Sequence, residues 1–117
     1  MTDFINDTSD LNFFDDNSGI YSKFDKMNLV DFYLFNIFIH HGDFWNHNYY
    51  IIRNKMPSKF FLIPWDFDNS FGQYSWYKYE PDNIFSCFGR NLLFERLRNN
   101  EKFIKELSIR WAALRAD

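Results

Sequence analysis

Residues 48–66, with the sequence NYYIIRNKMPSKFFLIPWD, decide the fold of this chain. Two runs rich in aromatic and β-branched residues, 48–54 and 59–65, flank a short connection that contains Pro57. Such runs are typical of strands, and Pro is typical of the turn between them. Because a connection this short joins antiparallel strands, the stretch predicts a small antiparallel β-hairpin.

A buried helix is predicted before the hairpin, over residues 25–40. Its apolar side chains go almost all the way round, which is typical of a helix that is covered on most sides. Asp25 or Asn28 is expected to cap its N-terminus, and Gly42 is expected to end it. The chain is therefore expected to build its core around this helix.

Two further helices are predicted after the hairpin, over residues 91–99 and 101–115, beyond a long loop at 69–90. Arg90, Arg96 and Arg98 are expected on a solvated helix face. The fold class is thus α+β, mainly helical with one small antiparallel hairpin. The last helix carries an apolar stripe that is expected to face the core: Phe103, Ile104, Leu107, Trp111 and Leu114.

The composition excludes several classes of protein. The chain has 117 residues, of which 23% are aromatic, and this aromatic content argues against disorder. A single cysteine, Cys87, excludes a disulfide scaffold and is expected to be an inert thiol. The net charge of -3 argues against a nucleic-acid partner. The sequence shows neither a signal peptide nor an apolar stretch near the ~18 residues of a membrane span.

Charge divides the chain into two parts. Residues 1–22 contain five Asp and no Lys or Arg, so we expect residues 1–23 to form a solvated, acidic lead-in. Residues 24–117 are expected to form one lobe. Within it, residues 40–72 carry the candidate chemistry and residues 91–115 the helical end.

Polar residues gather just before and just after the predicted hairpin. Asp43 lies before the first predicted strand, and Asn48 is the first residue of that strand. Asp66 and Asp68 follow the second strand. Because a hairpin brings its two ends together, these four residues can converge. Carboxylate and amide oxygens suit hard Mg²⁺ or Mn²⁺, and Mg²⁺ in turn usually takes substrate phosphates. The sequence therefore predicts a metal–nucleotide site.

Plainer interpretations of the same residues stay open. Asp43 can belong to an Asx turn, Asn48 can simply open a strand, and Asp66 and Asp68 can be turn formers. His40, His41 and His47 with Asp43 can be considered as a zinc site, but their spacing fits no common ligand pattern. The aromatic residues Trp76, Tyr77 and Tyr79 are expected to pack rather than to stack on bases.

The order of these elements is that of a protein-kinase catalytic segment: D-x4-N, a hairpin, then an Asp that starts a loop. The segments 28–54 and 59–72 resemble the CotH family of atypical, protein-kinase-like spore-coat proteins, and the resemblance covers roughly residues 24–115. Its signature is a hydrophobic helix, N/H-x-D, HNYY-x-x-R and a strand that ends in PWD-x-D-x-x-x-G. The matching residues are Asp43, His47, Asn48, Tyr49, Tyr50, Arg53, Pro64, Trp65, Asp66, Asp68 and Gly72.

The resemblance implies a role for each matching polar residue. Asp43 is implied as the catalytic Asp, Asn48 and Asp66 as residues that bind the metal–ATP cofactor, and Asp68 as a further metal ligand. Conventional kinases carry a Lys two residues after the catalytic Asp, whereas this chain has Trp45 there. His47 or Arg53 can supply the missing positive charge.

The implied function is Mg²⁺- or Mn²⁺-dependent transfer of the γ-phosphoryl group of ATP to a Ser or Thr of a protein. A Gly-rich loop and a strand Lys are missing, and the first Glu is Glu80. The chain is therefore expected to be the C-terminal lobe of a kinase-like fold, inactive alone, with the nucleotide-gripping half either upstream in the gene or lost. The alternative is a non-catalytic interaction protein or adhesin that keeps the scaffold. The family implies a spore-coat or cell-surface location, and without it the chain is expected to be cytoplasmic.

Overall fold

The computed structural model describes residues 1–42, 47–55, 58–71 and 91–116. The α+β class is confirmed, since the described residues form mostly helices and one two-stranded antiparallel sheet. In chain order the elements are α1 (Thr2–Asp7), α2 (Asp10–Phe13), α3 (Ile20–Lys23), α4 (Lys26–Phe38), β1 (Tyr49–Ile52), β2 (Phe61–Pro64), α5 (Leu92–Arg98) and α6 (Glu101–Arg115).

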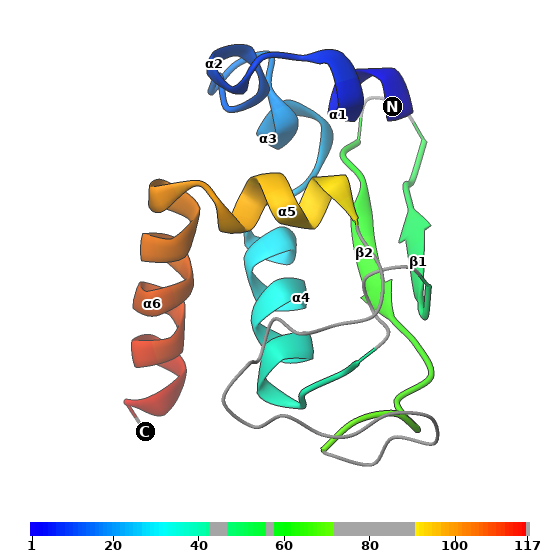
Figure 1. Cartoon of the computed structure of the whole chain (residues 1–117), viewed down its shortest axis with the longest axis vertical. Helices are drawn as coiled ribbons and strands as arrows, with labels where there is room; N and C mark the ends of the chain where they lie inside the picture. The colour runs from blue at the N-terminus through cyan, green and yellow to red at the C-terminus, as the bar shows by residue number, and fades with distance from the viewer. Residues whose placement is uncertain (43–46, 56–57, 72–90, 117) are drawn as a thin grey trace.

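Helix α4 is the centre of the fold. Figure 1 shows it between β2 on one side and α6 on the other, with α5 crossing near its first turns. Its side chains Leu29, Val30, Phe32 and Tyr33 are at most 3% exposed, as the all-round apolar pattern predicts. The core that they build also contains Phe13, Ile20, Phe24, Leu62, Leu93, Phe94, Leu97, Phe103 and Leu107.

The two ends of α4 differ in how well the sequence predicts them. Asp25 is the N-cap, because its carboxylate accepts the Asn28 N–H at 2.8 Å. The prediction that Gly42 ends the helix is wrong. The helix ends at Phe38, and His40 takes the left-handed conformation, with φ 52°, that a glycine usually supplies at this place. Bonds from His40 N–H to the Ile37 carbonyl and from His41 N–H to the Asn36 carbonyl close the end.

The predicted hairpin is present, with strands one or two residues shorter at each end than the sequence runs. Pro57, in the predicted turn, lies outside the described residues. β2 is fixed to α4 by Asn28, whose side-chain amide accepts the Leu62 N–H at 2.7 Å and donates to the Leu62 carbonyl at 3.0 Å. One side chain thus pairs with a strand as a neighbouring strand would.

The two C-terminal helices are confirmed, each with an asparagine N-cap, Asn91 for α5 and Asn100 for α6. The expectation for the stripe on α6 is wrong in part. Phe103 and Leu107 are buried, but Ile104, Trp111 and Leu114 are 37%, 37% and 54% exposed. The reason is that Trp111 packs on Phe38, which is itself 61% exposed, so this end of the helix pair stays open.

The first 23 residues are more structured than a solvated lead-in. All five Asp in this segment are exposed, as expected, but Phe13 and Ile20 are fully buried in the core. Arg96 holds this N-terminal segment in place. The expectation that Arg96 lies on a solvated helix face is therefore wrong. The Arg96 guanidinium donates to the Ile5 and Thr8 carbonyls at 2.7 and 2.6 Å, contacts the Asp10 carboxylate, and lies 3.8 Å from the Phe13 ring centroid.

Replacing Arg96 with Met is expected to lower the free energy of unfolding by about 2 kcal/mol. The Met side chain keeps apolar contact with Phe13, but the carbonyls of Ile5 and Thr8 lose their donors. Urea denaturation measures the change. Asp10→Asn is the matched control and is expected to cost less than about 0.5 kcal/mol, because Asp10 is 83% exposed. An equal loss in both variants would show that only the ion pair matters.

Candidate functional site

The hairpin brings two of the predicted site residues to the same place. Tyr49 pairs with Pro64, and one step further the Asn48 carbonyl accepts the Trp65 N–H at 2.8 Å. Asn48 therefore lies opposite Trp65, the residue that precedes Asp66, at the end of the hairpin away from its turn. Asp68 follows two residues later on an exposed stretch. Asp43, the predicted catalytic residue, lies outside the described residues.

Backbone conformation explains why Asn and Asp stand at this end. Asn48 has φ 66° and Asp66 has φ 57°, so both occupy the left-handed region, which Asn and Asp tolerate better than other non-glycine residues. The turn-forming interpretation of Asp66 thus describes its backbone, while its carboxylate remains exposed to solvent. Asn48 is partly exposed.

No group of three or more His, Cys, Asp or Glu that could hold a metal occurs among the described residues, which include His40, His41 and His47. Asn48 is not one of these residue types, and Asp43 lies outside the described residues. The metal-ligand roles of Asn48, Asp66 and Asp68 therefore stay a prediction.

The segment after Asp66 packs against the end of α4. Phe71 N–H donates to the Ile39 carbonyl at 2.7 Å, and Gly42 N–H donates to the Asn69 carbonyl at 3.0 Å. Asn69 and Ser70 are buried at this junction. The chain that leads into Asp43 is therefore held directly against the chain that carries Asp66 and Asp68.

From the sequence, His41 is considered only as a possible zinc ligand, and its buried, structural role beside the site is missed. His41 is 1% exposed, its Nδ1 lies 2.8 Å from the Asn36 Oδ1, and its ring meets that of Phe67 edge-on at 5.5 Å. Because the Asn36 Nδ2 donates to the Phe32 carbonyl, the Asn36 Oδ1 is the acceptor and His41 Nδ1 carries the proton. A signal was present in the sequence, namely an Asn among the apolar residues of the second half of the helix, five residues before a His.

Tyr49 connects the hairpin to α5. Its hydroxyl accepts from the Asn91 Nδ2 at 3.0 Å, and its ring packs edge-on against Phe32 and Phe94. Burial raises the pKa of Tyr49, which keeps the phenol neutral at physiological pH. This Tyr of the HNYY motif is thus a packing residue that fixes where β1 begins.

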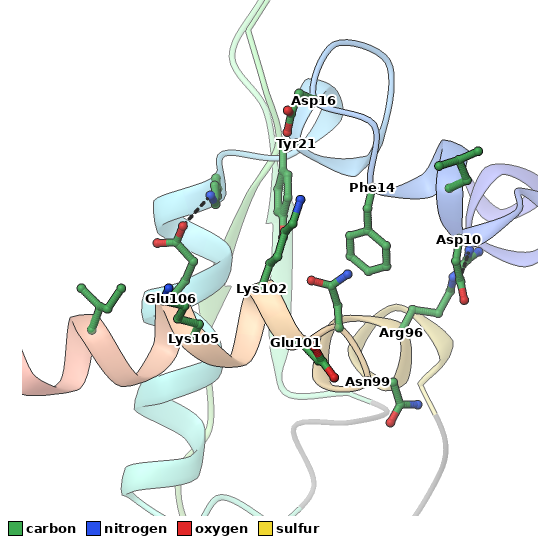
Figure 2. A pocket seen from close by; sticks show the side chains of 14 residues that line it. Asp10, Phe14, Asp16, Tyr21, Arg96, Asn99, Glu101, Lys102, Lys105 and Glu106 are labelled. Atoms are coloured by element: carbon green, nitrogen blue, oxygen red, sulfur yellow. Dashed lines mark hydrogen bonds and ion pairs between the residues drawn. The ribbon is translucent and has the colours of Figure 1, made fainter.

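A cavity of about 820 Å³ opens elsewhere, between the N-terminal helices and the start of α6 (Figure 2). Burial, with Glu106 and Asp16 nearby, raises the pKa of Tyr21 in its wall to about 12. Lys26 forms an ion pair with Glu106 at 2.8 Å. The charges of the lining residues balance, four acidic against four basic, so they favour no class of ligand: Asp10, Asp16, Glu101 and Glu106 against Lys26, Arg96, Lys102 and Lys105.

A buried helix, a hairpin and an Asp-containing segment follow one another here in the order of a protein-kinase catalytic segment. A comparison with protein-family models identifies the family, since the model described as CotH kinase protein matches residues 1–117. The chain belongs to the CotH family, and the match extends the resemblance to the N-terminal 23 residues. Comparisons with curated proteins and with solved structures give no match. None of the described helices has the length and apolar character needed to cross a bilayer.

Proposed function

We propose that this chain is the catalytic and metal-binding lobe of a kinase that binds ATP with Mg²⁺ or Mn²⁺ at the Asn48–Asp66 end of the hairpin and transfers the γ-phosphoryl group to a Ser or Thr of a protein, with the nucleotide-gripping half supplied from outside these residues. The observation that supports the proposal is the register, which pairs Asn48 with Trp65, the residue just before Asp66. Membership of a kinase family supports the reaction class. We further propose that the acceptor is a spore-coat or cell-surface protein, in keeping with the family.

The donor set fits such a cation. Asp66 and Asp68 are exposed carboxylates and Asn48 offers an amide oxygen, which are the ligands that Mg²⁺ and Mn²⁺ prefer. When bound, the metal neutralises phosphate charge. In the proposal Asn48 and Asp66 hold the metal–nucleotide, Asp68 adds a further oxygen, and Asp43 orients the acceptor hydroxyl and takes its proton.

Because Trp45 stands where conventional kinases carry a Lys, one positive charge near the γ-phosphate is missing. The two candidates for that positive charge, His47 and Arg53, lie at opposite ends of β1. Arg53 follows the opposite end of β1, where its guanidinium lies 4.5 Å from the centroid of the Phe60 ring. Since β1 has four residues, Arg53 is roughly 15 Å along the strand from Asn48. His47, the neighbour of Asn48 in the chain, is the candidate that we retain.

Phosphoryl transfer tests the proposal directly. The full-length protein and this chain alone are each incubated with millimolar ATP labelled at the γ-phosphate and with casein as a general Ser/Thr acceptor. Label is expected on casein with the full-length protein in Mg²⁺ or Mn²⁺ and not in EDTA, and little or no label is expected with the chain alone, which has no Gly-rich loop. A full-length protein that binds Mn²⁺ at Asn48 and Asp66 yet transfers no label would favour the non-catalytic interaction protein instead.

A further inference from the structure

The two edges of the hairpin differ in how their backbone groups are used. Because Asn48 and Trp65 form a hydrogen-bonded pair, the next such pairs along the antiparallel ladder are Tyr50 with Ile63 and Ile52 with Phe61. The N–H and C=O groups of Tyr49 and Ile51 therefore point away from β2. Pro64 fits this register, because Pro has no N–H and the Tyr49–Pro64 pair is not a hydrogen-bonded one.

The outer edge of β2 is closed. Asn28 takes both backbone groups of Leu62, as described above. Phe60 N–H donates to the Lys23 carbonyl at 2.8 Å, and the Phe60 carbonyl accepts the Asp25 N–H at 3.0 Å. Asn28 of α4 and the chain just before α4 thus cover this edge from Phe60 to Leu62.

The outer edge of β1 is open. Among the described residues no hydrogen bond reaches the outward N–H or C=O groups of Tyr49 and Ile51. Figure 1 shows β1 at the margin of the molecule, with β2 between it and α4. Soluble proteins usually protect such an edge with Lys, Pro or a bulge, but β1 reads YYII and carries none of these.

We propose that the β1 edge receives an extended segment of the acceptor protein, which adds to the sheet as a third strand. This inference rests on the proposed function. An added strand lies about 4.8 Å from β1, so a segment that continues past Asn48 brings its next residues beside the Asn48–Asp66 end. Strand addition would thereby deliver a Ser or Thr to the site that we propose for transfer.

The acceptor fits this edge better than a second copy of the chain does. β1 offers four outward groups over four residues, and pairing of so short a strand buries far less than the ~1,200 Å² of a stable interface. A weak and transient contact suits a substrate. The exposed face beside the edge is apolar, with Tyr50, Ile52, Phe61 and Ile63 41–53% exposed. The favoured segment is therefore uncharged and rich in β-branched residues around its Ser or Thr.

Amide hydrogen exchange on the whole chain tests the inference, with the blocked pentapeptide Thr-Val-Ser-Val-Thr as the probe. At saturating peptide, the Tyr49 and Ile51 amides are expected to exchange about tenfold more slowly, while those of Tyr50 and Ile52 are already protected. Ile51→Pro removes one outward N–H without touching the β2 ladder and is expected to weaken peptide binding about tenfold. Ile51→Val keeps the N–H and is expected to bind as the wild type does.

The outcomes separate this inference from the proposed function. Protection of Tyr49 and Ile51 without any phosphoryl transfer by the full-length protein would support docking and overturn transfer. Transfer to the peptide Ser by the full-length protein with the same KM in Ile51→Pro and Ile51→Val would overturn docking and leave transfer standing. Protection that rises with protein concentration in the absence of peptide would assign the edge to a second copy and overturn the inference. The wild-type measurement decides the matter even if Ile51→Pro fails to fold.

Discussion

Replacing Asp66 with Asn is expected to lower phosphoryl transfer by the full-length protein at least about 100-fold and to leave the fold intact. Loss of a residue that only supports a metal ligand typically costs 10- to 100-fold, so loss of a ligand should cost at least the upper value. Asn is the right replacement because Asp66 has φ 57°. Ala at this position would add backbone strain and would confuse a folding defect with the loss of a ligand.

Site-specific metal binding provides the second measurement for this variant. In the wild type, Mn²⁺ is expected to broaden the amide NMR signals of Asn48, Asp66 and Asp68 before those of the remaining chain. Asp66→Asn is expected to remove this selectivity. Asp7→Asn, an exposed residue of α1, makes the same change of charge and is expected to alter nothing. If Asp66→Asn transferred label at the wild-type rate, Asp66 would form the turn and would not bind the metal.

The sequence predicts those parts of the fold that follow from local pattern. The hairpin follows from two β-prone runs around a turn, and α4 from its apolar residues and the Asp25 cap. The pairing of Asn48 with Trp65 also follows, because an antiparallel hairpin fixes which residues share an end. None of these needs knowledge of a distant contact.

Features that depend on distant partners were not predicted. Arg96 looks like any charged residue on a helix, and only its contacts with the Ile5 and Thr8 carbonyls show that it anchors the N-terminus. The end of α4 was misplaced because the glycine rule points to Gly42, while His40 takes the left-handed conformation. Trp111 fits a core stripe by its spacing, but its partner on α4 is Phe38, the last residue of that helix, which is itself 61% exposed.

The largest effect on stability is expected at Asn28. Asn28→Ala leaves the N–H and C=O of Leu62 without partners, and Leu62 is 2% exposed. Each buried group left without a hydrogen bond costs about 1–3 kcal/mol, so we expect a loss of about 3 kcal/mol in the free energy of unfolding. That is a large part of the 5–15 kcal/mol that is typical of a domain. Urea denaturation measures the total, and faster exchange of the Leu62 amide locates it.

Asn6→Ala is the matched control for this change, because it removes the same side chain from an exposed helical position, where a change within about 0.5 kcal/mol is expected. The Asn28 variant also connects stability with the site. Because Asn28 sets how the hairpin sits on α4, its loss should weaken Mn²⁺ binding at Asn48 and Asp66 although it contacts neither. A loss below about 1 kcal/mol with unchanged Leu62 exchange would mean that side-chain packing alone, chiefly of Leu62 and Phe60 on the core, holds the hairpin in place.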